Sequence, residues 1–132
     1  MNFYSHIQEN SSYSNYYTLQ EYLDIEPNAE NIYNFFLLNL NIRSFLANYV
    51  KFEAFLECLP SSPHLIVVTE TWNGPHNVDL CNVDGFNCAH TYRKESRGGG
   101  VSIFVADHYQ LEQIESLCIC NEIIELCTVN LC

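Results

Sequence analysis

The chain has 132 residues, of which 48% are hydrophobic and 14% aromatic, so it is long enough to form one domain with a packed core. It carries 16 acidic and only five basic residues, which gives a formal net charge of -11. This balance excludes a protein that coats nucleic acid by neutralising phosphates, although a divalent cation can mediate contact between an acidic protein and nucleic acid.

The cysteines and the N-terminus indicate an intracellular protein. Seven cysteines, an odd number without a CxxC pair, are typical of reduced thiols. A zinc site made of Cys81, Cys88 and His90 matches no regular ligand spacing. The first residues, MNFYSHIQEN, lack the basic and apolar segments of a secretory signal, and the longest apolar run, residues 35–38, is too short to cross a membrane.

Residues 1–32 are polar and rich in Ser, Asn, Tyr and Glu, which predicts a loosely structured N-terminal extension with a short helix near residues 19–23. From residue 33 to residue 132 the pattern is that of a packed domain. FFLLNLNI, residues 35–42, predicts a strand with Leu38, Leu40 and Ile42 on its inner face.

A helix follows this strand, and Ser44 is its predicted N-cap. Its apolar positions recur at alternating steps of four and three residues, which makes one continuous stripe. They are Phe45, Tyr49, Phe52, Leu56 and Leu59. Pro60 and Pro63 end the helix.

LIVVTE, residues 65–70, is apolar on both faces, as is typical of a buried parallel strand, so the first half predicts a strand–helix–strand unit. In a parallel pair Asn41 and Glu70 both lie at carboxyl ends, on the rim where α/β sheets bind ligands. Carboxylate and amide oxygens suit Mg²⁺. A solvated strand end, with Asn41 in a local turn, is the alternative.

The second half predicts antiparallel strands. GFNCAHTYR (85–93) and VSIFVAD (101–107) both alternate, and KESRGGG (94–100) connects them. Further strand-like runs lie near 115–120 and 122–132, and the last still alternates at Cys132, so we expect a truncated domain. His90 is interpreted as an ordinary strand histidine.

Three of the five basic residues, Arg93, Lys94 and Arg97, lie beside Gly98-Gly99-Gly100. They are candidates for contacts with a DNA backbone. The simpler interpretation is a solvated basic patch on a flexible glycine turn.

Three segments carry a family resemblance. They are LNLNIRS (38–44), PHLIVVTETW (63–72) and RKESRGGGVSIFVAD (93–107). In this order they resemble the endonuclease/exonuclease/phosphatase superfamily, and within it the endonuclease of non-LTR (LINE-type) retrotransposons. The resemblance covers about residues 35–130. It implies an α/β fold, the N-terminal portion of a four-layered α/β sandwich with a βαβ unit followed by mainly antiparallel strands.

The resemblance also implies a chemistry. Glu70 would coordinate the catalytic Mg²⁺ or Mn²⁺, and Asn41 would help to orient the metal and the scissile phosphate. The reaction would be phosphodiester hydrolysis that nicks DNA in the nucleus. The 3′ end at the nick would then prime reverse transcription.

The sequence departs from the family in its catalytic set. The family continues with Tyr-Arg-Pro-Pro-like, Gly-Asp-Phe-Asn-like and Ser-Asp-His-like motifs and a reverse transcriptase segment, which these 132 residues do not contain. We therefore expect the chain alone to be inactive. Two alternatives remain: a non-catalytic relic or interaction protein that retains half of the fold, and another phosphoesterase of the superfamily.

Overall fold

The structure is a computed structural model that describes residues 18, 20–21, 24 and 35–132. Most of the predicted extension, residues 1–32, therefore lies outside the described residues. Within the predicted short helix, Gln20 and Glu21 are helical, and the backbone N–H of Asp24 donates to the carbonyl oxygen of Gln20 at 3.0 Å. The fold described below is that of residues 35–132.

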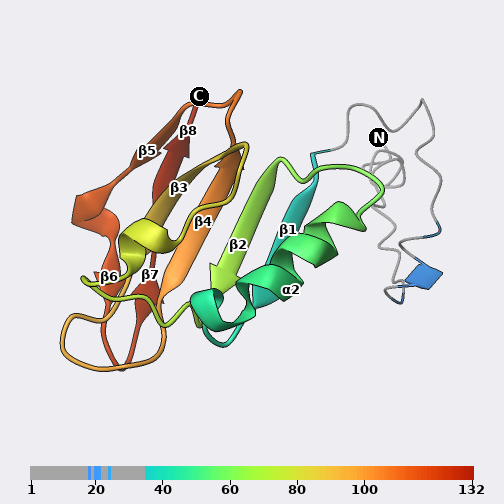
Figure 1. Cartoon of the computed structure of the whole chain (residues 1–132). Helices are drawn as coiled ribbons and strands as arrows, with labels where there is room; N and C mark the ends of the chain where they lie inside the picture. The colour runs from blue at the N-terminus through green and yellow to red at the C-terminus, as the bar shows by residue number, and fades with distance from the viewer. Residues whose placement is uncertain (1–17, 19, 22–23, 25–34) are drawn as a thin grey trace, which may run out of the picture.

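The first half forms the predicted strand–helix–strand unit. Strand β1 (Leu37–Asn41) is followed by helix α2 (Phe45–Glu57) and strand β2 (Leu65–Thr69). β1 and β2 pair in parallel, and the register runs from Leu37 opposite Leu65 to Asn41 opposite Thr69. Figure 1 shows α2 lying alongside β1 and β2. The apolar side chains that alternate in residues 35–42 and those of the stripe on α2 therefore belong to one buried layer between the helix and the sheet.

Strands β3 (Phe86–Thr91) and β4 (Val101–Ala106) complete a four-stranded sheet in the order β1-β2-β4-β3. β4 is antiparallel to both of its neighbours. The sheet is thus mixed, with β2 and β4 in its centre. The short 3-10 helix η2 (Val78–Leu80) lies in the connection from β2 to β3.

Apolar side chains cover β2 and β4 on both faces, as the run in 65–70 predicts. One buried cluster joins Phe45 and Phe52 of α2 to Ile66, Val68 and Phe104 of the sheet. The other joins Leu65, Ile103 and Val105 to partly buried side chains of the C-terminal segment. Those are Tyr109, Leu111, Cys127, Val129 and Leu131.

The C-terminal segment differs from the prediction. Instead of two longer strands it forms β5 (Leu111–Gln113), the 3-10 helix η3 (Glu115–Leu117), β6 (Ile119–Cys120), β7 (Glu125–Leu126) and β8 (Val129–Leu131). β5 pairs with β8 and β6 with β7, as two small antiparallel ladders. A turn interrupts the run because Asn121 Oδ1 accepts backbone N–H groups from Ile123 and Ile124, both at 2.8 Å.

The start and end of α2 also differ from the prediction. Ser44 precedes the helix, but its side chain makes no capping hydrogen bond because its backbone is left-handed, with φ 84°. The backbone N–H groups of Ser44 and Phe45 donate instead to the carbonyl oxygens of Glu70 and Thr71, at 2.8 and 2.9 Å. The helix ends before Leu59. No helix in the described part of the chain is long and apolar enough to cross a membrane.

Candidate functional site

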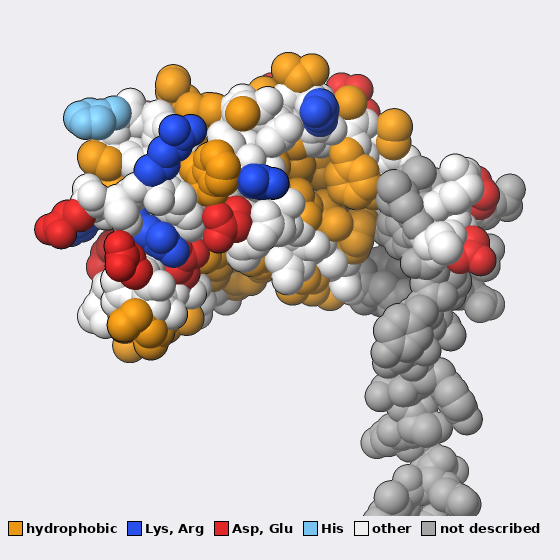
Figure 2. Space-filling model, turned by 90° about the horizontal axis from the view of Figure 1, so that it is seen from below, with side chains coloured by type: hydrophobic (Ala, Val, Ile, Leu, Met, Phe, Trp, Pro, Cys, Tyr) orange, Lys and Arg blue, Asp and Glu red, His pale blue; other side chains and the backbone are white. Residues whose placement is uncertain are grey.

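Four elements of the sheet meet at one rim. β1, β2 and β3 end there and β4 begins there, so the loops 42–44, 70–77 and 92–100 lie close together. Figure 2 shows this face of the molecule, on which basic side chains lie among acidic and hydrophobic ones. The rim is therefore the place where the residues predicted from the sequence can meet.

Glu70 follows β2 directly at this rim, and its carboxylate is held by two donors. Trp72 Nε1 donates to Glu70 Oε2 at 2.8 Å, and the Gly99 backbone N–H donates to the same oxygen at 3.3 Å. The carbonyl oxygen of Glu70 accepts the backbone N–H of Ser44 at 2.8 Å. Both of these side-chain hydrogen bonds go to Oε2, and in the described part of the chain none goes to the other carboxylate oxygen, Oε1.

The backbone at the rim is strained. Four non-glycine residues of the described chain have a positive φ, and all four lie in the first two rim loops. They are Arg43 (49°), Ser44 (84°), Glu70 (55°) and Trp72 (56°). Left-handed backbone is unfavourable for residues with a Cβ and concentrates at functional sites. The rim is therefore the part of this fold that carries the signature of a functional site.

The glycine loop is docked against Glu70 rather than free. Trp72 N–H donates to the Gly99 carbonyl oxygen at 2.8 Å, and Thr71 N–H donates to that of Gly100 at 3.3 Å. A Cβ on Gly99 would collide with the Glu125 carboxylate, and one on Gly100 would come within 2.6 Å of Thr71 Oγ1. Both glycines also have a positive φ, so close approach and backbone conformation together require them.

The predicted DNA-contact residues lie at this rim in three different environments. Arg93 forms an ion pair with Glu125, at 2.7 Å between Arg93 Nη2 and Glu125 Oε1. The Arg97 guanidinium lies 5.5 Å from the ring centroid of Trp72, as a cation–π contact. Lys94 is exposed. With the exposed Arg43, four of the five basic residues of the sequence lie on rim loops.

Asn41 lies at the same rim as Glu70, at the end of the neighbouring strand. The register places it opposite Thr69, its side chain is exposed, and no hydrogen bond joins it to the Glu70 side chain in the described residues. Residues 18, 20–21, 24 and 35–132 contain no group of three or more His, Cys, Asp or Glu side chains that could hold a metal ion. The described side chains therefore do not form an enclosed metal site at the rim.

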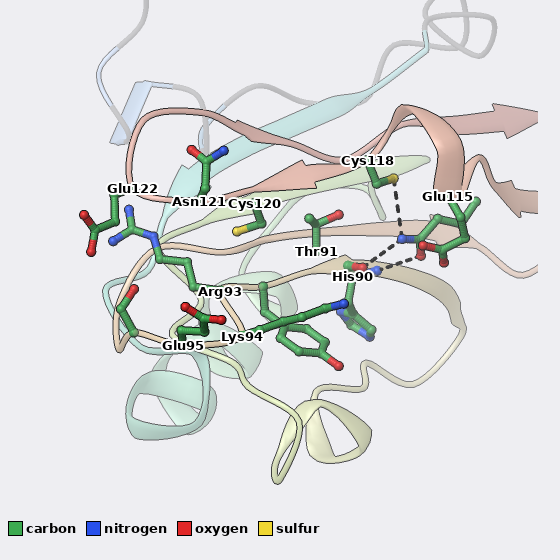
Figure 3. Close-up of a pocket in the computed structure, with 13 residues that line it drawn as sticks. His90, Thr91, Arg93, Lys94, Glu95, Glu115, Cys118, Cys120, Asn121 and Glu122 are labelled. Carbon is green, nitrogen blue, oxygen red and sulfur yellow. Dashed lines mark hydrogen bonds between the residues drawn. The ribbon is translucent and has the colours of Figure 1, made fainter.

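A separate hollow of about 880 Å³ lies beside the rim (Figure 3). Arg93 and Lys94 line it together with His90 and Gln113, whereas Glu70 and Asn41 do not. Gln113 Oε1 accepts the backbone N–H of His90 at 3.1 Å, and Gln113 Nε2 donates to the His90 carbonyl oxygen at 2.8 Å. The Gln113 side-chain amide thus forms the same pair of hydrogen bonds with the backbone of β3 that a neighbouring strand would form.

Sequence reasoning missed several residues of the rim. The sequence predicts only a strand position for Glu125, and nothing in the sequence connects it to Arg93, 32 residues earlier. Arg43 is separated from the other rim bases in the sequence, although its place two residues after Asn41 is a signal. Thr71 and Asn73 are buried, and Thr71 Oγ1 has no hydrogen-bond partner in the described chain.

Comparisons with known proteins give little further information. No protein-family model matches the sequence, and no curated protein matches it. Among solved structures, the chain is similar to the crystal structure of an AP endonuclease from Leishmania major, with 15% sequence identity and a TM-score of 0.48. The similarity covers 72% of this chain and 35% of that one, so the chain spans about a third of that structure's length.

Proposed function

We propose that residues 33–132 are the N-terminal part of a divalent-metal-dependent endonuclease domain that hydrolyses phosphodiester bonds in DNA. Glu70 is the metal ligand of this chain. The observation that supports the proposal best is the geometry of Glu70. One carboxylate oxygen is fixed by the Trp72 indole and the Gly99 amide, which leaves the other oxygen to a cation at the carboxyl ends of parallel strands.

The rim residues have distinct roles in this proposal. Glu70 Oε1 holds Mg²⁺ or Mn²⁺, and the exposed Asn41 amide orients the metal's water shell and a substrate phosphate. The cation, when bound, stabilises negative charge on the phosphate and on the leaving oxygen. Lys94 and Arg97 approach the DNA backbone, where cations offset the net charge of -11 that the chain carries.

The more specific part of the proposal is a retrotransposon-type endonuclease. It is supported by three sequence motifs that resemble those of the retrotransposon endonucleases: NIRS (41–44), TETW (69–72) and RGGGV (97–101). These three segments are the ones that the fold brings to one rim, because they end β1, end β2 and begin β4. Further metal ligands and a general base would have to come from outside the described residues.

The proposal is tested by titrating the protein with Mn²⁺ while the fluorescence of Trp72, the single tryptophan of the chain, is recorded. Paramagnetic Mn²⁺ bound to Glu70 quenches the indole that hydrogen-bonds to the same carboxylate. We expect Glu70→Gln to weaken this saturable quenching by about tenfold or more, because the charged ligand is lost.

Glu57→Gln is the matched control. Glu57 is an exposed acid at the end of α2, so its substitution makes the same charge change away from the rim. Equal quenching of the wild-type protein and both variants would reject Glu70 as the metal ligand.

A non-catalytic interaction protein is the second candidate. Large apolar side chains of the C-terminal segment are exposed around the β6–β7 hairpin, which is unusual for a surface that contacts only water. They are Leu117, Ile119, Ile123, Ile124 and Leu126, with Ile123 90% exposed. Folded protein without any saturable Mn²⁺ response would favour this second function.

A further inference from the structure

Glu125, at the start of β7, binds both ends of the loop 92–100 although it lies far from the loop in sequence. Its Oε1 atom accepts from Arg93 Nε at 2.8 Å and lies 2.7 Å from Arg93 Nη2. Its Oε2 atom accepts the backbone N–H of Gly100 at 3.1 Å. The Arg93 and Glu125 side chains are only 23% and 19% exposed, so these charge-assisted hydrogen bonds are partly shielded from water.

The loop is folded around the Glu125 carboxylate. Gly99 has φ 64°, and a Cβ at this position would overlap the carboxylate of Glu125 and come within 2.7 Å of Arg93 Nε. The carboxylate therefore occupies the space that a side chain at position 99 would need. Only a glycine allows this packing.

The carbonyl side of the Gly99–Gly100 peptide group and the N–H of the preceding peptide group face Trp72 and the proposed metal ligand, Glu70. Gly99 N–H donates to Glu70 Oε2 at 3.3 Å, and the Gly99 carbonyl oxygen accepts Trp72 N–H at 2.8 Å. Gly99 and Gly100 thus join two carboxylates that belong to different parts of the fold. A shift of the loop on the Glu125 side would displace a donor on the Glu70 side.

We propose that Glu125 is a positioning residue of the rim. By fixing Arg93 and Gly100, it holds the Gly99 amide against Glu70 and keeps Arg97 over Trp72. The inference rests on the proposed function in so far as the carboxylate positioned in this way is a metal ligand. It also assigns a structural role to Arg93, which orients Glu125.

The experiment uses the full chain and five variants, one of which is the Glu70→Gln protein introduced above. Glu125→Gln keeps the size of the side chain and an acceptor for Gly100 but removes the negative charge that binds Arg93. Glu122→Gln, an exposed position on the same hairpin, is the matched control. Arg93→Lys keeps the positive charge but loses the two-nitrogen geometry, so it tests the same contact if Glu125→Gln does not fold. The double variant Glu70→Gln/Glu125→Gln tests whether Glu125 acts through Glu70.

Two measurements are made on each folded variant. The first is acrylamide quenching and the emission maximum of Trp72 without metal, and the second is the affinity for Mn²⁺ by titration. We expect Glu125→Gln to make Trp72 more accessible to acrylamide and to weaken Mn²⁺ binding by about tenfold. Arg93→Lys should change both readouts in the same direction to a smaller extent, and Glu122→Gln should change neither.

The outcomes separate this inference from the proposed function. If Glu125→Gln lowers only the melting temperature and leaves the Trp72 signal and the Mn²⁺ affinity as in wild type, the positioning role is wrong and the function stands. If Trp72 responds to Glu125→Gln but the wild-type protein binds no Mn²⁺, the positioning is supported and the function fails. In the double variant, additive effects of the two substitutions on Trp72 accessibility would reject action through Glu70.

Discussion

His90 lies in β3, where its Nδ1 atom is 2.8 Å from the hydroxyl oxygen of Ser102, a fully buried residue of β4. Burial lowers the pKa of His90, and the charge of Asp79 opposes this shift weakly. The neutral ring is therefore favoured in the folded protein. The histidine that sequence reasoning assigned to an ordinary strand position has a structural hydrogen bond in the core.

This arrangement predicts a pH dependence of stability. Between the lowered pKa of folded His90 and the ordinary histidine pKa of 6.5, the unfolded chain binds a proton that the folded chain excludes. The free energy of unfolding should therefore fall as the pH decreases through this window. In His90→Asn, whose amide still reaches Ser102, that part of the slope should disappear. Urea denaturation from pH 7.5 to 5 measures it, and identical slopes for the two proteins would contradict the prediction.

Single residues also mark the limit of what the sequence could predict about the site. Asn41 and Glu70 could be placed at one rim because parallel strands end at the same edge, which needs only the hydrophobic pattern. The contacts of Glu70 with Gly99, and of Arg93 with Glu125, join segments 29 and 32 residues apart. Such pairs depend on how β4 and β7 pack, and local pattern carries no information about that.

At the scale of elements, the regular segments of the first half were predictable and those of the C-terminus were not. β1, α2, β2, β3 and β4 each bury one face or both in a core, so their hydrophobic periodicity reflects their structure. The segment 115–126 instead leaves Leu117, Ile119 and Ile123 exposed. The apolar residues of this segment therefore do not mark a buried strand face. For this reason the hydrophobic alternation predicts longer strands than the observed β6 and β7.

Gln113 links β5 to the edge of the main sheet and provides a prediction at this scale. Gln113→Leu removes both hydrogen bonds to the His90 backbone and leaves a part-buried N–H and carbonyl group without this partner. We expect a loss of roughly 1–3 kcal/mol in the free energy of unfolding. Urea denaturation measures it, with Gln110→Leu, an exposed glutamine three residues earlier, as the control. A loss no larger than that of the control would show that the edge pairing does not stabilise the fold.

At the scale of the whole molecule, the described residues of the rim include the Glu70 carboxylate but no group of three metal-ligating side chains. Loss of members of a catalytic set is severe because they act together. We therefore expect the 132-residue protein to leave supercoiled plasmid uncut in Mg²⁺ or Mn²⁺, as seen on an agarose gel. Nicking by the wild-type protein that is absent with Glu70→Gln protein would contradict this, whereas nicking by both would indicate a contaminating nuclease.

The order of strands in the sheet has a consequence for biosynthesis. β2 is central, but one of its neighbours, β4, is made only after the whole segment 70–100. As the chain emerges from the ribosome, the unit β1-α2-β2 is complete while one backbone edge and one apolar face of β2 still lack their partners. Such edges are templates for wrong pairing, and translation at roughly 5–20 residues per second leaves this edge open for seconds. Slow emergence of residues 70–131 from the ribosome would therefore favour aggregation of the nascent chain, because β4 supplies the missing edge and the C-terminal segment then covers the remaining apolar face.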